Sequence, residues 1–361
     1  MTTLLCAILI MTQDPKPPLI NQKDVDEAIK RGHDWLLSKV KEGLPGDVAL
    51  NGGKGLTYDG LVLYTLKHAG CDVNDGTIQR LIATVKGAKP TRTYQVATHA
   101  LALALIDPNK YRETLAIYAQ YLVDQICDNG QWGYGDAYEV PVPAVPVASG
   151  EGASTTAKFK IKKSKKFTPA AVGDNSNTQY AALGLWACSK AGVEFDPEFL
   201  DRAIKWWETT QQPDGGWGYS DQGKFDDKHG TYGAMTAGGA GSLVILRKLR
   251  GHDPKSSAAR KGIQWCVDHW AVDKNPATPQ DRLWAHFYFL YALERLGDLF
   301  GTEKMGKHLW YAEGADYLLK TQKVGTWCGT NAGFMIPDTC FGVLFLKRSM
   351  AVATTSAADK K

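Results

Sequence analysis

The chain has 361 residues, of which 44% are hydrophobic and 22% charged, so it can bury a large core and is neither disordered nor fibrous. The formal net charge is +4, but six lysines lie between Lys158 and Lys166. Without them, 36 basic residues face 38 acidic ones. The near-neutral remainder argues against nucleic acid as a partner, and no apolar run reaches the roughly 20 residues of a membrane-spanning helix.

Residues 1–24 combine an apolar start with a Pro-rich lead-in. The run from Leu4 to Met11 has the length of an export-signal core, but no Lys or Arg precedes it and no small-x-small cleavage site follows. Export, a misassigned start and an apolar tail therefore stay open, as do exported, cytoplasmic and peripheral-membrane locations. The seven cysteines form no C-x-x-C pair and are expected to be mostly buried apolar side chains.

Apolar residues recur with helical spacing along the chain, in two alternating kinds of segment. Six segments have one charged face and predict outer helices: 25–40, 77–86, 113–127, 198–211, 256–271 and 308–322. Six others are apolar almost all round and predict enclosed helices: 57–68, 94–106, 178–191, 232–249, 282–296 and 338–350. We therefore expect an all-α domain over 25–350, an α/α toroid (α6/α6 barrel) of six inner and six outer helices. An open solenoid is the alternative, which the enclosed set disfavours.

The longest gap between inner segments predicts an insertion over 137–173. It begins with alternating valine and proline from Val140, which predicts an extended segment, and it ends in the lysine stretch Lys158–Lys166. Alternation within that stretch favours a short strand, so we expect an inserted loop or a β-hairpin flap. Its open roles are a lid, a patch for an anionic membrane surface or an acidic partner, and a solvated loop. Residues 351–361 are expected to be a disordered tail.

Three outer segments end in Gln followed by Gly and Trp. The copies are Gln125-Ile-Cys-Asp-Asn-Gly-Gln-Trp132-Gly-Tyr, Gln212-Pro-Asp-Gly-Gly-Trp217-Gly-Tyr and Gln322-Lys-Val-Gly-Thr-Trp327. The glycine makes the turn after the helix, and the tryptophan is expected to pack between hairpins. In these motifs the chain resembles the terpenoid cyclase and protein prenyltransferase superfamily, which has similar QW repeats and an α/α toroid fold. The resemblance covers 25–350 and implies a hydrophobic polyprenyl or triterpenoid substrate.

Squalene-hopene-type cyclases carry an Asp-x-Asp-Asp-Thr motif at the start of an inner helix, where the middle carboxyl donates a proton. This chain keeps only the last Asp and the Thr, as Asp338-Thr339. Asp338 is therefore either a catalytic acid or a helix N-cap, because a lone Asp at a helix start is favoured as an anion. A catalytic Asp338 should be buried in the toroid and approach Asp59 or His286. A cap should accept the backbone N–H two or three residues later.

Other ionisable residues give weaker indications. Asp226 and Asp227, with His229, precede an inner segment and either share a proton, bind a cation or are solvated. Asp59, His99 and His286 lie in inner segments, where a histidine is more often a satisfied core residue. Zinc-dependent prenyltransferases use an Asp-x-Cys and a His. Asp338-Thr-Cys340 matches that spacing without a matching His, so no metal is expected, and no nucleotide-binding fingerprint indicates a cofactor.

Aromatic side chains of the inner segments are expected to line the central cavity, with Asp59 and His286 as polar members. They are Tyr58, Tyr94, Tyr180, Tyr232, Trp284, Phe287 and Phe341. Aromatic faces either stabilise a carbocation or hold an apolar chain. Three functions stay open: a cyclase (isomerase) or prenyltransferase-like enzyme, a non-catalytic toroid that binds a hydrophobic ligand or a protein, and a carbohydrate-active α6/α6 barrel, which needs two carboxylates in its cleft.

Overall fold

A computed structural model of the chain describes residues 18–45, 48–50, 54–145, 158–164, 173–219, 230–278, 285–329 and 332–350. Several sequence-based expectations fall outside these residues. They are the apolar start up to residue 17, the tail 351–361, much of the insertion, Lys165, Lys166, Asp226, Asp227, His229 and Trp284.

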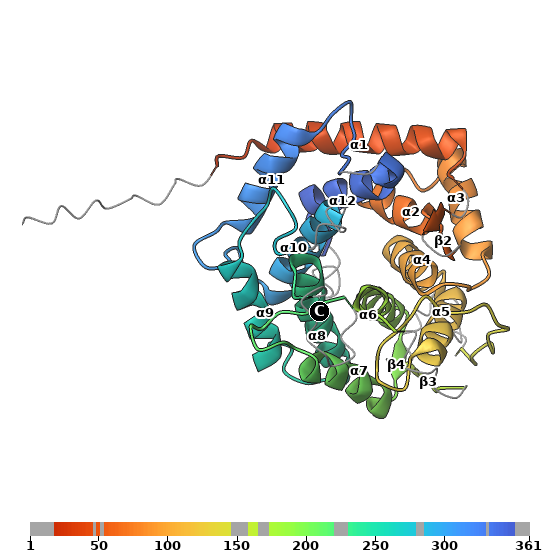
Figure 1. Cartoon of the computed structure of the whole chain (residues 1–361). Coiled ribbons are helices and arrows are strands. Elements are labelled where there is room, and N and C mark those ends of the chain that lie inside the picture. Colours follow the sequence, from red (N-terminus) through yellow and green to blue (C-terminus); the bar gives the residue numbers. More distant parts are fainter. Residues whose placement is uncertain are drawn as a thin grey trace, which may run out of the picture.

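Twelve helices in the described part of the chain alternate between an outer and an inner ring (Figure 1). The outer helices are α1 (Gln22–Glu42), α3 (Gly76–Gly87), α5 (Arg112–Gln125), α7 (Pro197–Thr209), α9 (Ser257–Asp268) and α11 (Trp310–Thr321). The inner helices are α2 (Asp59–His68), α4 (Thr93–Ile106), α6 (Asn175–Ser189), α8 (Gly233–Arg250), α10 (His286–Phe300) and α12 (Met335–Lys347). This arrangement confirms the expected all-α toroid of six inner and six outer helices.

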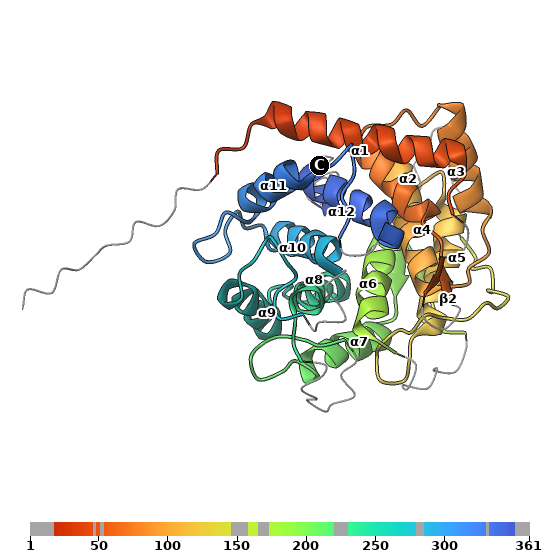
Figure 2. The ribbon, with the colours of Figure 1, turned by 45° about the horizontal axis from the view of Figure 1, so that its top comes forward.

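The inner ring closes on itself. Each inner helix contacts the next one along the chain, and α12 contacts α2. The first outer helix, α1, contacts both α11 and α12, so it joins the two ends of the chain (Figure 2). The open solenoid is therefore excluded.

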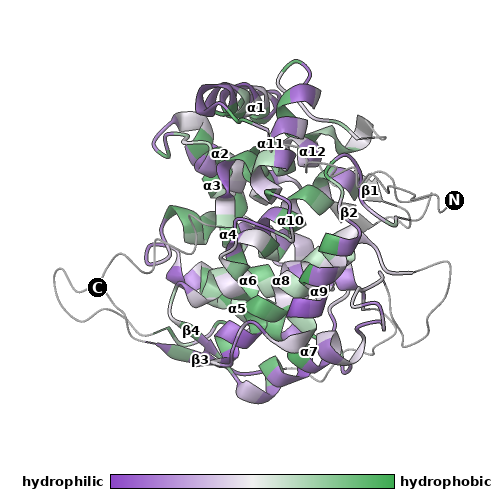
Figure 3. Ribbon diagram, turned by 90° about the vertical axis from the view of Figure 1, so that its left-hand side faces the viewer, coloured by the Kyte–Doolittle hydropathy of each residue, from purple (hydrophilic) through white to green (hydrophobic). Residues whose placement is uncertain are grey.

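Hydrophobic patterning explains which helices lie inside. In α6 every residue from Asn175 to Cys188 is buried, whereas α7 buries one face that contains Phe199, Ala203 and Trp207. Figure 3 shows the same contrast between the mainly hydrophilic α1 and the mainly hydrophobic α6 and α8. A helix without a polar face is stable only when other helices surround it.

Small residues let the inner helices approach closely. A Cβ atom at Gly184 of α6 would lie 3.0 Å from the Cα atom of Ala97 in α4 and 2.7 Å from Cδ1 of Leu122 in α5. The absence of a side chain at Gly184 is therefore required by packing. This requirement accounts for the Ala- and Gly-rich composition of the inner segments.

The repeated tryptophans join the two rings. Trp132, Trp217 and Trp327 are at most 1% exposed. Their indole N–H groups donate to backbone carbonyls of the preceding outer helices, those of Leu122, Trp207 and Leu318, at 2.7, 2.9 and 2.9 Å. Because each indole is buried and hydrogen-bonded in the same way, the tryptophans have a structural role.

The insertion departs from the expected β-hairpin. Its strand β3 (Phe159–Ile161) pairs in parallel with β4 (Val193–Phe195), which follows α6. The pairing with β4 places Ile161 and Val193 in the core, and both are less than 5% exposed. The hairpin that the structure does contain joins β1 (Val48–Leu50) and β2 (Lys54–Leu56), and the sequence reading did not anticipate it.

Part of the lysine stretch is engaged within the protein. Lys158 pairs with Glu194 at 3.1 Å, and Lys163 donates to the carbonyl oxygen of Asp124 at 2.9 Å. Docking on an anionic membrane surface stays a prediction. None of the helices in the described ranges is long and apolar enough to cross a bilayer.

Candidate functional site

A cavity lies at the N-terminal ends of the six inner helices. It contains about 950 Å³ of empty space, the part open to solvent included. Every inner helix contributes lining residues from its first two turns or from the residue just before it, and two loops add one tyrosine each. The described lining residues are Thr57, Tyr58, Leu61, Tyr94, Thr98, Tyr134, Ser176, Tyr180, Tyr219, Tyr232, Ala234, Met235, Ala285, Tyr288, Phe334, Pro337, Asp338 and Phe341.

Five of the predicted aromatic residues line this cavity: Tyr58, Tyr94, Tyr180, Tyr232 and Phe341. Three other predicted residues do not. Phe287 packs into the core, and Asp59 and His286 have hydrogen-bond partners elsewhere. These three expectations were wrong because the rotation of each inner helix about its own axis turns the side chains away from the cavity.

Asp59 points from α2 toward α4. Its Oδ1 lies 3.0 Å from Nε2 of His99 and accepts the backbone N–H of Gly60 at 3.0 Å. Burial by itself raises the pKa of Asp59, but the hydrogen bond and charge of His99 outweigh it and hold the pKa below its usual value. Asp59 lines a separate groove beside α3.

His286 is a satisfied core residue, as a histidine in an inner helix was expected to be. Its Nε2 lies 2.9 Å from the carbonyl oxygen of Val272, and its ring packs against Tyr317 with centroids 5.1 Å apart. Burial lowers its pKa. His286 is therefore a neutral hydrogen-bond donor to the backbone.

Asp338 lies in the first turn of α12 and lines the cavity while only 3% exposed. It is not a helix cap, because α12 begins at Met335 and the residue before it, Phe334, makes no side-chain capping bond. The backbone N–H of Gly329 donates to Oδ2 of Asp338 at 2.8 Å. Burial raises the pKa of Asp338 to about 7, although this N–H partly opposes the shift.

The surroundings of Asp338 explain why it holds a proton. The expected ionisable neighbours Asp59 and His286 are occupied elsewhere. The titratable groups whose pKa values the charge of Asp338 affects are Tyr58 and Cys340, whose pKa values burial raises to about 12, and Cys328, whose pKa burial also raises. All three are uncharged at neutral pH, and no charged group among the described residues lowers the pKa of Asp338.

Hydroxyl groups from opposite sides of the ring meet at another part of the cavity wall. Tyr94 of α4 hydrogen-bonds to Ser176 of α6, and Ser176 lies 3.1 Å from the hydroxyl of Tyr288 in α10. The rings of Tyr94 and Tyr180 lie 4.3 Å apart, and Tyr288 packs edge-on to Phe341 at 5.7 Å. Aromatic faces therefore surround the space next to Asp338.

The sequence reading missed six polar lining residues: Thr57, Thr98, Tyr134, Ser176, Tyr219 and Tyr288. Two of them carry a recognisable pattern, because Tyr134 and Tyr219 each follow a repeat tryptophan by two residues. The third repeat has Gly329 at this place, and its N–H binds Asp338. No comparable sequence pattern identifies Ser176 or Tyr288.

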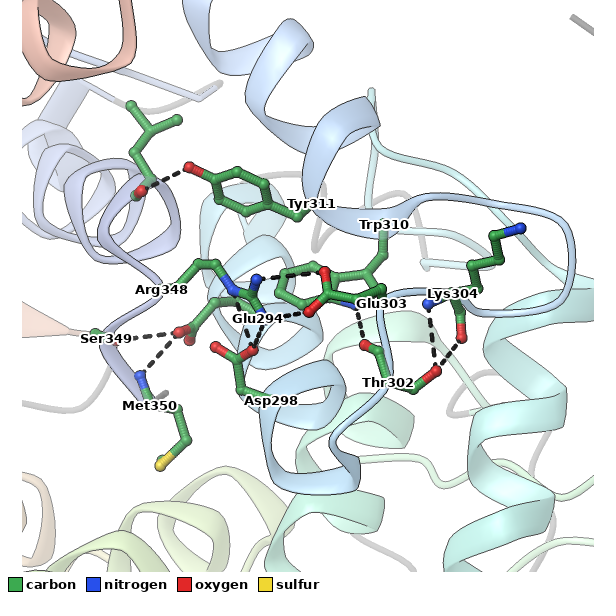
Figure 4. Close-up of polar contacts among 11 residues, drawn as sticks. Glu294, Asp298, Thr302, Glu303, Lys304, Trp310, Tyr311, Arg348, Ser349 and Met350 are labelled. Carbon is green, nitrogen blue, oxygen red and sulfur yellow. Dashed lines mark hydrogen bonds and ion pairs between the residues drawn. The ribbon is translucent and has the colours of Figure 1, made fainter. Parts of the chain in front are cut away.

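A second acidic cluster lies at the C-terminal end of α10, away from the cavity (Figure 4). Glu294 is fully buried and accepts the backbone N–H of Met350 at 2.9 Å. Asp298, one turn later, forms an ion pair with Arg348. Burial and the neighbouring charge of Asp298 raise the pKa of Glu294 well above its usual value.

Among the described residues, no three His, Cys, Asp or Glu side chains are placed to hold a metal ion. The Asp-x-Cys pattern ends in Cys340, which is fully buried and whose thiol pKa is about 12. A thiolate at this position is therefore strongly disfavoured.

Residues 175–295 match the family model of the squalene-hopene cyclase C-terminal domain. This region runs from α6 into α10 and does not include Asp338. The match confirms the resemblance to the terpenoid cyclase superfamily that the repeats predicted. A comparison with curated proteins found no match.

Solved structures with a similar fold include a type II terpene cyclase and proteins of two glycoside hydrolase families. A variant of the type II terpene cyclase MstE from Scytonema, in complex with geranylgeranyl dihydroxybenzoate (substrate), has a TM-score of 0.56 and 13% identity, covering 92% of this chain and 98% of that one. A possible GH105 member from Salmonella enterica has a TM-score of 0.55 and 12% identity, and the match covers 98% of this chain and 100% of that one. The GH76 mannosidase from Bacteroides thetaiotaomicron has a TM-score of 0.51 and 12% identity, and the match covers 91% of this chain and 100% of that one. At these identities the likeness extends to the fold alone.

Proposed function

We propose that this protein is a terpenoid-cyclase-like enzyme that acts on a hydrophobic polyprenyl or triterpenoid substrate and starts ring closure by protonating a double bond. Asp338 is the proton donor. One observation carries the proposal: Asp338 is the only carboxyl group among the described lining residues, and burial raises its pKa to about 7. A raised pKa keeps the proton on part of the molecules at neutral pH, where an ordinary aspartate would be ionised.

The proposed chemistry needs only groups that the cavity supplies. The π electrons of the alkene take the proton from Asp338, which leaves a carboxylate and a tertiary carbocation. The N–H of Gly329, 2.8 Å from Oδ2, stabilises that carboxylate. Neighbouring double bonds then close the rings, the last cation loses a proton to water, and the Asp338 carboxylate takes up a proton from solvent before the next turnover. The product is an isomer of the substrate.

Aromatic rings support the cationic part of the reaction. Tyr58, Tyr180 and Phe341 line the same cavity as Asp338, and the negative face of an aromatic ring attracts a cation. Their surfaces also hold the apolar chain and exclude water, which would otherwise capture the carbocation.

The three other functions are less well supported. A carbohydrate-active enzyme needs two carboxyl groups facing one bond, and the described lining residues include one. Prenyl transfer to a thiol needs an activated thiolate, whereas the pKa of Cys340 is about 12. A non-catalytic binding protein gains nothing from a buried carboxyl group, which costs stability wherever it ionises.

The proposal is tested with the full-length protein. Wild type and Asp338→Asn are incubated separately with squalene, farnesol and geranylgeraniol, and the products are analysed by gas chromatography and mass spectrometry. We expect cyclic products with the mass of the substrate, one added deuterium when the reaction is run in D₂O, and a loss of at least about 100-fold in rate for Asp338→Asn.

Asp59→Asn is the matched control, because Asp59 is also an acid in the first turn of an inner helix, partly buried, but does not line the cavity. It should keep wild-type turnover. Absence of cyclic product from all three isoprenoids, or equal turnover by Asp338→Asn and wild type, would overturn the proposal. Binding without turnover would favour the non-catalytic function, and cleavage of a polysaccharide panel the carbohydrate-active one.

A further inference from the structure

The three repeats share a hydrogen bond that the sequence motif did not reveal. In each repeat the backbone N–H of the tryptophan donates to a threonine hydroxyl on the following inner helix. The pairs are Trp132 with Thr178 at 3.0 Å, Trp217 with Thr236 at 3.1 Å and Trp327 with Thr339 at 3.3 Å. All three threonines are fully buried, so the same buried Trp–Thr hydrogen bond occurs in each of the three repeats.

The contact makes the three repeats comparable residue by residue. The position before the threonine is Asn177 in the first repeat, Met235 in the second and Asp338 in the third. Only the third repeat therefore places an ionisable side chain there. The N–H that reaches this side chain comes from Gly329, two residues after the tryptophan.

The third contact connects directly to the acid. Oγ1 of Thr339 accepts the N–H of Trp327 and donates to its carbonyl oxygen, both at 3.3 Å. Thr339 therefore ties both polar backbone groups of Trp327 to the first turn of α12. Since Asp338 and Gly329 each lie within two residues of this contact, it sets their relative position.

We propose that Thr339 is a positioning residue for Asp338, which keeps the Gly329 N–H on Oδ2 and leaves Oδ1 to carry the proton into the cavity. This role rests on the proposed cyclase function. An oxygen that accepts an N–H bond serves as the carbonyl oxygen of a protonated carboxyl group, so the proton resides on the other oxygen. The same N–H then stabilises the carboxylate that proton transfer leaves behind.

The other two repeats provide matched controls. Thr178→Val, Thr236→Val and Thr339→Val each remove one hydroxyl from a buried site with little change in volume. Thr178 and Thr236 do not line the cavity. All three variants should lose a similar amount of thermal stability, because each leaves a buried tryptophan N–H without its partner.

The variants should differ in catalysis. For Thr339→Val we expect kcat to fall about 10-fold or more, KM to stay the same and the pH midpoint of turnover to rise, because the Asp338 carboxylate loses its aligned N–H donor. Thr339→Ser keeps the hydroxyl group and should therefore have the wild-type kcat and pH midpoint. Thr178→Val and Thr236→Val should keep the wild-type kcat and midpoint at temperatures where they are folded.

The outcomes separate this role from the proposed function. If Thr339→Val matches the two control variants in kcat and pH midpoint, Thr339 has only a structural role and this inference is wrong. If wild type forms no cyclic product, the proposed function fails and the positioning role fails with it. If Thr339→Val does not fold, Thr339→Ala and Thr178→Ala are compared instead. A lower kcat and a higher pH midpoint for Thr339→Ala alone support the positioning role, and equal values for the two variants contradict it.

Discussion

Asp59 and Asp338 both lie in the first turn of an inner helix, α2 and the neighbouring α12, yet their pKa values move in opposite directions. Asp338 is buried and Asp59 is partly buried, and burial by itself raises both pKa values. Asp59 has Nε2 of His99 3.0 Å from its Oδ1, whereas Asp338 has one backbone N–H and, within the described ranges, no cation that lowers its pKa. The partner therefore decides which of the two keeps a proton at neutral pH.

Turnover should fall as the pH rises through about 7. The proton donor is the neutral form of Asp338, and burial sets its pKa to about 7, so the active fraction decreases tenfold per pH unit above that value. A pH–rate profile on a cyclised isoprenoid measures this midpoint. A rate that stays constant between pH 6 and 9 would exclude Asp338 as the donor.

Asp59→Asn should lower stability at neutral pH without changing turnover. The pKa of Asp59 is below its unfolded value, so its contribution is present above the unfolded pKa of about 3.9 and is lost as the pH falls through the folded pKa. Because the bond from His99 weakens when the acceptor is neutral, we expect a loss of about 1 kcal/mol at pH 7. Urea unfolding of wild type and Asp59→Asn at pH 7 and pH 3 tests this. An equal difference in the free energy of unfolding between the two proteins at both pH values would contradict it.

Glu294→Gln should gain stability relative to wild type as the pH rises. The folded-state pKa of Glu294 lies well above its usual value because of burial and the charge of Asp298. The folded state therefore retains a proton that the unfolded state loses above about pH 4.5, so this group destabilises the fold as the pH increases. Glutamine can still accept the N–H of Met350 (Figure 4). Urea unfolding at pH 5 and pH 8 checks the prediction, which a pH-independent difference would refute.

Two glycines of the inner helices should respond oppositely to alanine. A Cβ atom at Gly297 of α10 would lie 2.4 Å from Cε2 of the buried Trp310, so Gly297→Ala should cost about 1–3 kcal/mol through overpacking. At Gly241 of α8 the nearest atom is Cδ1 of Leu299 at 3.6 Å, and Gly241→Ala should stabilise the helix by up to about 1 kcal/mol. Thermal unfolding of both variants provides the comparison, and a stabilised Gly297→Ala would show that Trp310 can move.

The sequence alone determined the architecture because the distinction between inner and outer helices is local. The burial of every residue from Asn175 to Cys188 and the single buried face of α7 follow directly from hydrophobic spacing. The repeat motifs located the buried tryptophans for the same reason, since each motif lies within one helix end and the turn after it. Asp338 was also found from the sequence, through its partial motif at the start of an inner helix.

Only the tertiary structure decided which side chains face the cavity. A helix that is apolar all round has no polar stripe to fix its rotation, so the sequence could not tell that Tyr288 lines the cavity and that its neighbour Phe287 does not. The pairing of β3 with β4, the contact of Asp59 with His99 and the N–H of Gly329 on Asp338 all join separate elements. Such contacts depend on how the hairpins pack against one another, and packing is a property of the closed ring rather than of any segment within it.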